Sequence, residues 1–260
     1  MTMRITMKST LRRTAALLLL ALLQACASGP NARKEDPLEP LNRSIFNFNE
    51  GLDRAVLKPV ATTYRDVTPA PVRLGVTSFF GNIADAWSMV NSVLQGKPVD
   101  AMDSFFRVTT NTLWGVGGIF DVASLAEIPK HKEDFGKTLG VWGFAPGPYL
   151  VLPLLGPSSV RDTVGTVVDA KGGVLGRVED VPVRNSLAGM RLLDTRTNLL
   201  GLSDSLDQAA LDKYTFTRDI YLQRRQSLLG KDDQEVEERY DLPEVVPAGA
   251  AATTPVPPAN

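Results

Sequence analysis

Residues 36–56 read DPLEPLNRSIFNFNEGLDRAV, and the spacing of their apolar side chains predicts the fold class. Apolar residues recur there every three or four positions, which places them on one face of an α-helix. The positions are Leu41, Ile45, Phe48 and Leu52. Phe46 lies off this stripe, so we expect it either to pack on a second part of the protein or to face something apolar outside. The stretch predicts an amphipathic helix.

The same periodicity predicts further helices along the chain. After a break at 69–71, PAP, one apolar stripe comprises Ile83, Trp87, Val90 and Leu94, and the next comprises Met102, Phe105 or Phe106, Thr109 and Leu113. The short turn at 95–98, QGKP, joins these two helices into an antiparallel hairpin. Later helices are expected around 183–201 and 213–229, and Ser159 and Asp162 have capping-box spacing for another. The predicted fold class is all-α.

Two segments between these helices are apolar but rich in Gly and Pro. They are residues 114–123, WGVGGIFDVA, and residues 140–157, GVWGFAPGPYLVLPLLGP. Pro and Gly exclude long helices, and Pro excludes a central strand. Two interpretations stay open: buried irregular connections that cross the core, or apolar backbone that lines a cavity or lies at a membrane surface.

The N-terminus predicts a lipoprotein signal. Arg4, Lys8, Arg12 and Arg13 precede the apolar run 15–23, AALLLLALL, and Cys26 follows after two further residues, Gln24 and Ala25. A basic region, a short apolar region and a small residue before the cleavage point are typical of a secretory signal. A cysteine at the cleavage point is typical of bacterial lipoproteins, so we expect lipidation at Cys26.

Four regions follow from this division of the chain. Residues 1–25 form the signal peptide, 26–35 a lipidated tether, 36–230 one helical domain, and 231–260 a disordered acidic Pro/Ala-rich tail. Removing the signal removes four basic residues, so the mature chain carries 24 Lys and Arg against 29 Asp and Glu, a net charge of −5. Nucleic acid is therefore not an expected partner.

The residues give little support for catalysis. His131 is the single histidine, stands among charged residues and is expected in a solvated loop or at a helix start. The chain has no G-x-S-x-G motif for a serine hydrolase. No second His and no further Cys accompany His131 as metal ligands, and the Gly115–Gly118 cluster does not follow a strand as a dinucleotide fingerprint requires. We expect neither an enzyme, nor a metal site, nor a cofactor.

Several blocks together resemble the MlaA (VacJ) lipoproteins. The match begins with DPLEPLNRSIFNFN at 36–49 and continues through YRDVTPAPVR at 64–73, FFGNI at 79–83, MVNSVLQG at 89–96, FFRVTTNT at 105–112, GVGGIFDVA at 115–123, FGKTLG at 135–140, GPYLVLP at 147–153 and GPSSVRD at 156–162. It is close over residues 36–170 and looser beyond. Their order and spacing make the resemblance specific, and the lipoprotein signal agrees with it independently.

The resemblance implies a ring-like bundle of amphipathic helices with a central channel, embedded in the inner leaflet of the outer membrane. It implies removal of mislocalised phospholipid from the outer leaflet. Its partners would be phospholipid, a trimeric outer-membrane porin and a soluble periplasmic carrier of the MlaC type. The alternative is a scaffold lipoprotein that binds porins or surface partners without passing lipid.

The resemblance also implies candidate channel or gate residues. They are Asn47, Phe48 and Asn49 in the first helix and Gly115, Gly117 and Gly118 in the glycine-rich segment. From the residues alone, Phe48 is expected in the core because it lies on the apolar stripe. For the asparagines, the alternative is a solvated or capping role. For the glycines, the alternative is close packing of the backbone. Arg161 and Asp162 are expected in a helix cap and a surface ion pair rather than at a headgroup.

Overall fold

The computed structural model describes residues 36–229, and within them the protein is mostly helical, as predicted. The elements in chain order are α2 (Glu39–Leu52), η1 (Asp53–Leu57), α3 (Lys58–Val67), α4 (Ala70–Leu94), α5 (Pro98–Leu113), α6 (Val122–Leu125), α7 (Phe135–Val141), β1 (Tyr149–Leu152), β2 (Gly156–Ser159), α8 (Val160–Gly172), η2 (Val174–Arg177), α9 (Val181–Asn198), α10 (Leu200–Ala209) and α11 (Lys213–Leu229). The predictions for the signal peptide, for lipidation at Cys26, for the tether and for the tail concern residues outside this range. Among the described residues, no helix combines the length and apolarity needed to span a bilayer.

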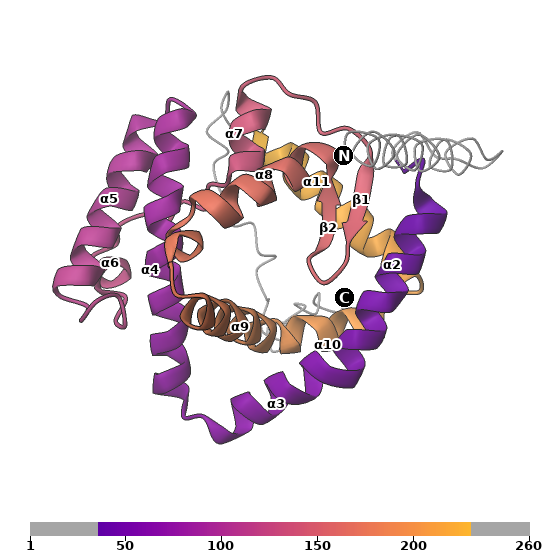
Figure 1. Cartoon of the computed structure of the whole chain (residues 1–260), viewed down its shortest axis with the longest axis horizontal. Coiled ribbons are helices and arrows are strands. Elements are labelled where there is room, and N and C mark those ends of the chain that lie inside the picture. Colours follow the sequence, from indigo (N-terminus) through magenta and orange to yellow (C-terminus); the bar gives the residue numbers. More distant parts are fainter. Residues whose placement is uncertain (1–35, 230–260) are drawn as a thin grey trace, which may run out of the picture. The chain divides into compact units, whose positions relative to one another are not determined.

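The first helical stretch continues from α2 through η1 into α3, and η1 is one turn of π-helix. Figure 1 shows α2, α3 and α4 following one another, with α9 and α10 beside α3. α3 ends at Val67, and Pro69 then stands at the N-cap of α4, where its missing N–H costs nothing. The ring-like arrangement and its channel stay predictions.

α4 and α5 form the predicted antiparallel hairpin, but the faces that they bury are polar. The buried residues of α4 include Asn82, Asp85, Ser88, Asn91 and Ser92, and those of α5 are Ala101, Ser104, Arg107 and Asn111. The apolar stripe predicted for α5 lies outside: Met102, Phe105, Phe106 and Leu113 are all exposed. An apolar stripe therefore does not mark the core in α5. The two helices meet through their polar faces instead.

Arg107 is the centre of this polar interior. Its side chain is 1% exposed, and its Nε donates to Asp85 Oδ2 at 3.1 Å. Its Nη2 donates to Asp121 Oδ1 at 2.9 Å and its Nη1 to the Ile128 carbonyl at 2.7 Å. Asp121 also caps the N-terminus of α6 through the Ser124 N–H. A buried charge is tolerated only when it is paired and hydrogen-bonded, so these contacts fix α6 and the loop after it against the hairpin.

A small apolar core lies at the β1–β2 hairpin. Tyr149 and Val151 of β1 are buried against Tyr214 of α11, with Phe46 of α2 packed beside them. The ring centroids of Phe46 and Tyr214 lie 5.6 Å apart in an edge-to-face contact. Phe46 therefore packs on a second part of the protein, which is the first of the two positions expected for it. Phe48 is 58% exposed, which corrects the expectation that it is a core residue.

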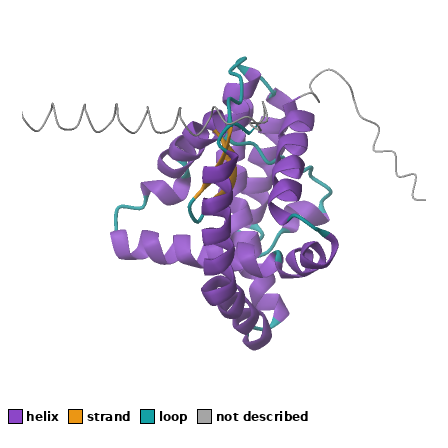
Figure 2. Cartoon of the chain, turned by 90° about the vertical axis from the view of Figure 1, so that its right-hand side faces the viewer, coloured by secondary structure: helices purple, strands orange, loops and turns teal. Residues whose placement is uncertain are grey.

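The apolar segment 140–157 contributes the first strand and the start of the second, instead of being wholly irregular. β1 pairs antiparallel with β2, with Tyr149 opposite Ser159 and Leu152 opposite Gly156. Pro157 is accommodated because a two-stranded sheet has only edge strands. Figure 2 shows these two strands among the helices. Ser159 then caps α8, since its Oγ accepts from the Asp162 N–H at 3.1 Å, which confirms the predicted helix start.

Replacing Asp85 tests whether the buried pairing holds the α4–α5 hairpin together. In Asp85→Ala, Arg107 loses one carboxylate in a buried site, and we expect the free energy of unfolding to fall by about 3 kcal/mol. The measurement is chemical denaturation of the purified full-length protein in detergent micelles. Asp66→Ala removes the partner of Arg65 in an exposed pair and serves as the control, with an expected change below about 0.5 kcal/mol. Equal effects of the two substitutions would contradict the role given to Arg107.

Candidate functional site

A cavity of about 360 Å³ lies between α2, η1, the β1–β2 turn, α9, α10 and α11. Its apolar lining residues are Phe46, Leu52, Leu57, Leu154, Leu155, Pro157, Leu192, Leu199, Leu206, Ala210 and Phe216. Its polar lining residues are Asn49, Glu50, Asp53, Thr195, Arg196, Ser203, Lys213 and Thr217. A volume of a few hundred Å³ and a mainly apolar wall with a few polar groups are typical of small-molecule sites.

Asn49 fixes the β1–β2 turn against α2 at the edge of the cavity. Its Nδ2 donates to the Leu152 carbonyl at 2.9 Å, and its Oδ1 accepts from the Leu154 N–H at 2.9 Å. Both the nitrogen and the oxygen of the side-chain amide thus bind backbone groups. Leu154 and Leu155 in the same turn remain exposed and line the cavity. Asn49 therefore determines where the apolar tip of the hairpin stands.

Asn42 makes the same kind of contact two helical turns earlier. Its Nδ2 donates to the Tyr149 carbonyl at 3.0 Å, and its Oδ1 accepts from the Val151 N–H at 2.9 Å. Seven residues are close to two turns of α-helix, so the two amides lie on one face of α2 and hold β1 at both ends. Sequence reasoning missed Asn42. The seven-residue spacing of the two asparagines was the signal for it.

The other predicted residues of α2 lie away from the cavity lining. Asn47 and Phe48 are exposed, and neither is among the lining residues. Of the predicted trio, the structure thus brings only Asn49 to the cavity, whereas the neighbouring Glu50 and Asp53, which sequence reasoning did not select, also line it. The roles of Asn47 and Phe48 at a gate stay predictions.

The predicted glycines lie in the turn between α5 and α6, apart from the cavity and from α2 (Figure 1). Gly117 and Gly118 have φ of 69° and 93°, a left-handed conformation that favours glycine. A Cβ on Gly115 would lie 2.2 Å from the Phe120 carbonyl oxygen, which leaves no room for a side chain. Close packing is therefore present at Gly115. The turn exposes Trp114 and Phe120, so its outer surface is apolar.

Two ion pairs stand in the cavity wall. Arg196 of α9 binds Asp53 at both carboxylate oxygens, with Nε to Oδ1 at 2.6 Å and Nη2 to Oδ2 at 2.8 Å. This hydrogen-bonded pairing raises the pKa of Arg196. Lys213 Nζ lies 3.5 Å from Glu50 Oε2. The cavity thus holds two cations and two anions beside its leucine-rich wall.

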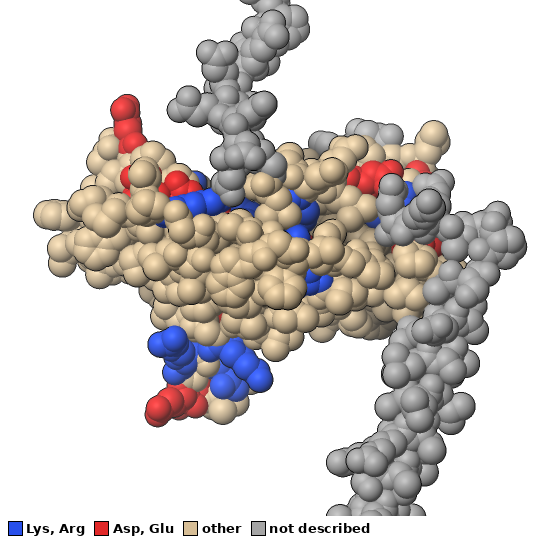
Figure 3. Space-filling model, turned by 90° about the horizontal axis from the view of Figure 1, so that it is seen from above, with Lys and Arg blue, Asp and Glu red and all other residues tan. Residues whose placement is uncertain are grey.

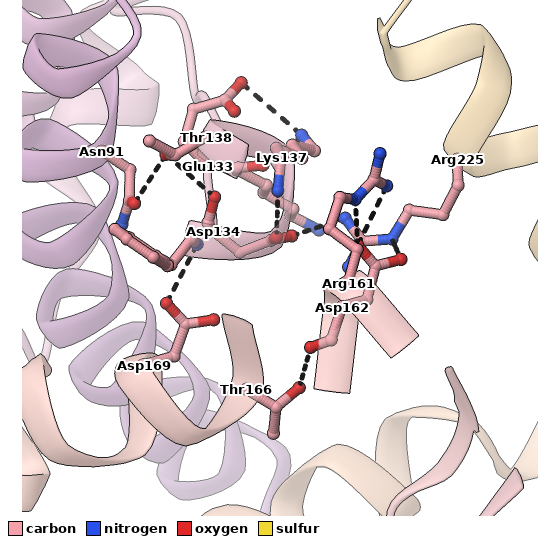
Figure 4. Close-up of polar contacts among 12 residues, drawn as sticks. Asn91, Glu133, Asp134, Lys137, Thr138, Arg161, Asp162, Thr166, Asp169 and Arg225 are labelled. Carbon is pink, nitrogen blue, oxygen red and sulfur yellow. Dashed lines mark hydrogen bonds and ion pairs between the residues drawn. The ribbon is translucent and has the colours of Figure 1, made fainter. Parts of the chain in front are cut away.

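Arg161 and Asp162 form a buried ion pair, which corrects the expectation of a surface pair. Their side chains are each 3% exposed, and Arg161 Nη2 lies 2.9 Å from Asp162 Oδ1. Arg225 of α11 approaches Asp162 Oδ2 at 3.2 Å and also binds Asp134 at 2.7 Å, as Figure 4 shows. Burial acts to raise the pKa of Asp162, but the Tyr221 hydroxyl and the two guanidinium groups outweigh it and hold this pKa below its usual value. The cluster joins α7, α8 and α11.

His131 is held by two acidic side chains of α5. Its Nε2 lies 2.9 Å from Asp103 Oδ2 and its Nδ1 3.6 Å from Asp100 Oδ2, so the ring contacts two carboxylates of α5. The residue itself lies in the loop between α6 and α7, which is one of the two positions expected for it. Within residues 36–229 no group of three or more His, Cys, Asp or Glu has an arrangement that could hold a metal ion.

The family model described as MlaA lipoprotein matches residues 34–228, which is most of the chain. The chain belongs to the MlaA lipoprotein family. The "Intermembrane phospholipid transport system lipoprotein MlaA" of Escherichia coli is 38% identical over 220 residues, which covers 82% of this chain and 87% of that protein. The protein of the same name from Haemophilus influenzae is 31% identical over 245 residues, which covers 88% of this chain and 94% of that protein.

A solved structure agrees with this family assignment. It concerns the structural basis for maintenance of bacterial outer membrane lipid asymmetry. It matches this MlaA-family chain with a TM-score of 0.67 and 36% sequence identity, over 75% of this chain and 100% of its own. The MlaA resemblance seen in the sequence blocks is therefore confirmed.

The pH dependence of stability offers a test of Asp169, a partly buried carboxylate of α8. Burial raises the pKa of Asp169, whose Oδ1 accepts from Trp87 Nε1 at 2.7 Å and from the Phe135 N–H at 3.0 Å. A raised folded-state pKa disfavours the ionised form, so the folded protein loses stability as pH rises from the unfolded-state pKa through the folded one. Asp169→Asn keeps the accepting oxygen and removes the charge. We expect it to unfold at a higher denaturant concentration than wild type at pH 7, with the difference vanishing near pH 3.

The control for this substitution is Asp66→Asn, which removes one negative charge at an exposed position. It should give no gain in stability at pH 7, because the charge that it removes is exposed. A lower stability of Asp169→Asn at pH 7 would contradict the cost assigned to the buried charge.

Proposed function

We propose that this protein is an outer-membrane lipoprotein that takes mislocalised phospholipid from the outer leaflet and passes it to a soluble periplasmic carrier. The observation that carries this proposal is the arrangement of polar and apolar side chains in residues 36–229: polar groups gather inside, and apolar side chains stand outside and around a cavity. Its MlaA relatives are named for intermembrane phospholipid transport.

The outer surface supports contact with lipid. Exposed large apolar side chains occur on almost every helix, among them Leu74, Phe105, Trp114 and Leu125, whereas the buried residues include more polar than apolar ones. Figure 3 shows a broad area of uncharged residues across one face, with most of the visible charged residues above and below it. Large exposed apolar patches mark interaction sites in soluble proteins, and exposed apolar side chains on a face with few charges fit an interfacial position in one leaflet.

The cavity supports passage of an amphipathic molecule. A phospholipid headgroup cannot cross hydrocarbon without losing its hydrogen bonds, which costs several kcal/mol. A wall with charged groups on one part and leucines on another gives both ends of a lipid a favourable surface. Transport of this kind involves no bond breaking, so the protein is proposed to act without a catalytic residue.

The remaining parts of the proposal follow the family resemblance. Acyl chains on Cys26 would tether the protein to the inner leaflet of the outer membrane. A trimeric porin would hold it there, and an MlaC-like carrier would accept the lipid in the periplasm. The exposed apolar surface also suits a scaffold that binds porins without passing lipid, and this stays the second candidate.

The first experiment labels outer-leaflet phosphatidylethanolamine in intact host cells with a membrane-impermeant amine reagent. Deleting the gene should raise the surface label severalfold, and the wild-type copy should reverse it. Unchanged label, with the protein present in the wild-type outer membrane, would contradict transport and leave the scaffold function.

A cavity-filling variant separates transport from scaffolding. Thr217 of α11 lines the cavity, whereas Gln223 of the same helix is exposed and does not. In a deletion strain, Thr217→Trp should fail to restore the low surface label although the protein is folded and correctly localised, because the indole occupies the space that lipid needs. Gln223→Trp is the matched control and should restore it. Full restoration by Thr217→Trp would favour the scaffold function.

A further inference from the structure

We propose that the ion pairs Arg196–Asp53 and Lys213–Glu50 form a subsite for the headgroup of a zwitterionic phospholipid. The phosphate would bind the two cations and the ammonium group the two carboxylates. This inference rests on the proposed transport function and names the site and the lipid class that the cavity selects.

The four charged side chains come together from three parts of the chain. Glu50 and Asp53 are three residues apart, so they neighbour each other on the helix surface at the junction of α2 and η1. Arg196 comes from α9, and Lys213 begins α11. All four line the same cavity. Asp53 is also the first residue of the π-helical turn, and such turns occur frequently at functional sites.

Arg196 has the geometry to hold a phosphate without leaving Asp53. Its Nε and Nη2 donate to the Asp53 carboxylate, and its Nη1 donates to Ser203 Oγ at 3.2 Å. These hydrogen bonds use three of the five N–H donors of a guanidinium. The remaining two can donate to phosphate oxygens, an anion that the planar guanidinium recognises well. The Arg196 side chain is 13% exposed and is one of the residues that line the cavity.

The balance of charge selects a zwitterion over an anion. An anionic headgroup would gain the two cations but would also place its charge beside Asp53 and Glu50, and like charges brought together in an interface oppose binding. A zwitterionic headgroup offers an ammonium group to these carboxylates and a phosphate to the cations. Every charge in the subsite then has an opposite partner, and the acyl chains meet Leu154 and Leu155.

The experiment measures phospholipid binding to the purified full-length lipoprotein in detergent micelles by native mass spectrometry. The probes are phosphatidylethanolamine and phosphatidylglycerol with identical acyl chains. Wild type should bind the zwitterionic probe at least about fivefold more tightly. Arg196→Gln should lower the affinity for both lipids by about tenfold, because both carry the phosphate. Asp53→Asn should lower the affinity for phosphatidylethanolamine alone and so remove the preference for the zwitterionic lipid.

Arg43→Gln is the matched control. Arg43 also binds a carboxylate with two nitrogens, that of Asp212, but it does not line the cavity. Arg43→Gln should leave the affinities for both lipids unchanged. This result would separate the loss of an ion pair from the loss of the subsite. Helical content measured by circular dichroism should be the same for all variants.

The outcomes separate this inference from the function on which it rests. If wild type binds both lipids equally, or if Arg196→Gln and Asp53→Asn behave like Arg43→Gln, the headgroup subsite is wrong while transport stands. If wild type binds neither lipid and the gene deletion leaves the surface label unchanged, the proposed function itself is overturned.

Discussion

The Arg107 guanidinium, buried between α4 and α5, is the group on which the left-hand part of the structure in Figure 1 depends. A charge in that position is stable only while Asp85, Asp121 and the Ile128 carbonyl all face it. Those contacts dictate that the polar faces of both helices turn inward. The apolar residues of α5 then face outward, so the exposure of Met102, Phe105 and Phe106 agrees with how this charge is satisfied.

The same rule governs the other side of the molecule. There α2 presents Asn42 and Asn49 to the backbone of the β1–β2 hairpin, and each amide satisfies one N–H and one carbonyl. Two strands alone are marginally stable, so this clamp and the packing on Tyr214 are what hold the hairpin. Because its apolar tip forms part of the cavity wall, the shape of the cavity depends on two amide side chains.

These two parts explain why a lipid-handling protein needs so little apolar core. Hydrogen-bonded and ion-paired contacts, including the Arg161–Asp162–Arg225 cluster, hold the helices to one another. The apolar side chains then remain available for a membrane leaflet and for acyl chains. Polar groups pair favourably where water is scarce, and apolar groups lose nothing when their surroundings are hydrocarbon.

The sequence by itself determined the helical class, the hairpin at 95–98, the helix start at Ser159 and the family, because helical periodicity, turn residues and capping are local. It did not determine which face of a helix is buried: Phe48 was expected in the core and is exposed, and the stripe with Met102 and Leu113 is exposed as well. That choice depends on partners distant in the chain, such as Asp121 for Arg107 or Leu152 for Asn49. Only the tertiary structure brought Asp53 to Arg196, 143 residues apart, since a long-range ion pair leaves no periodic signal.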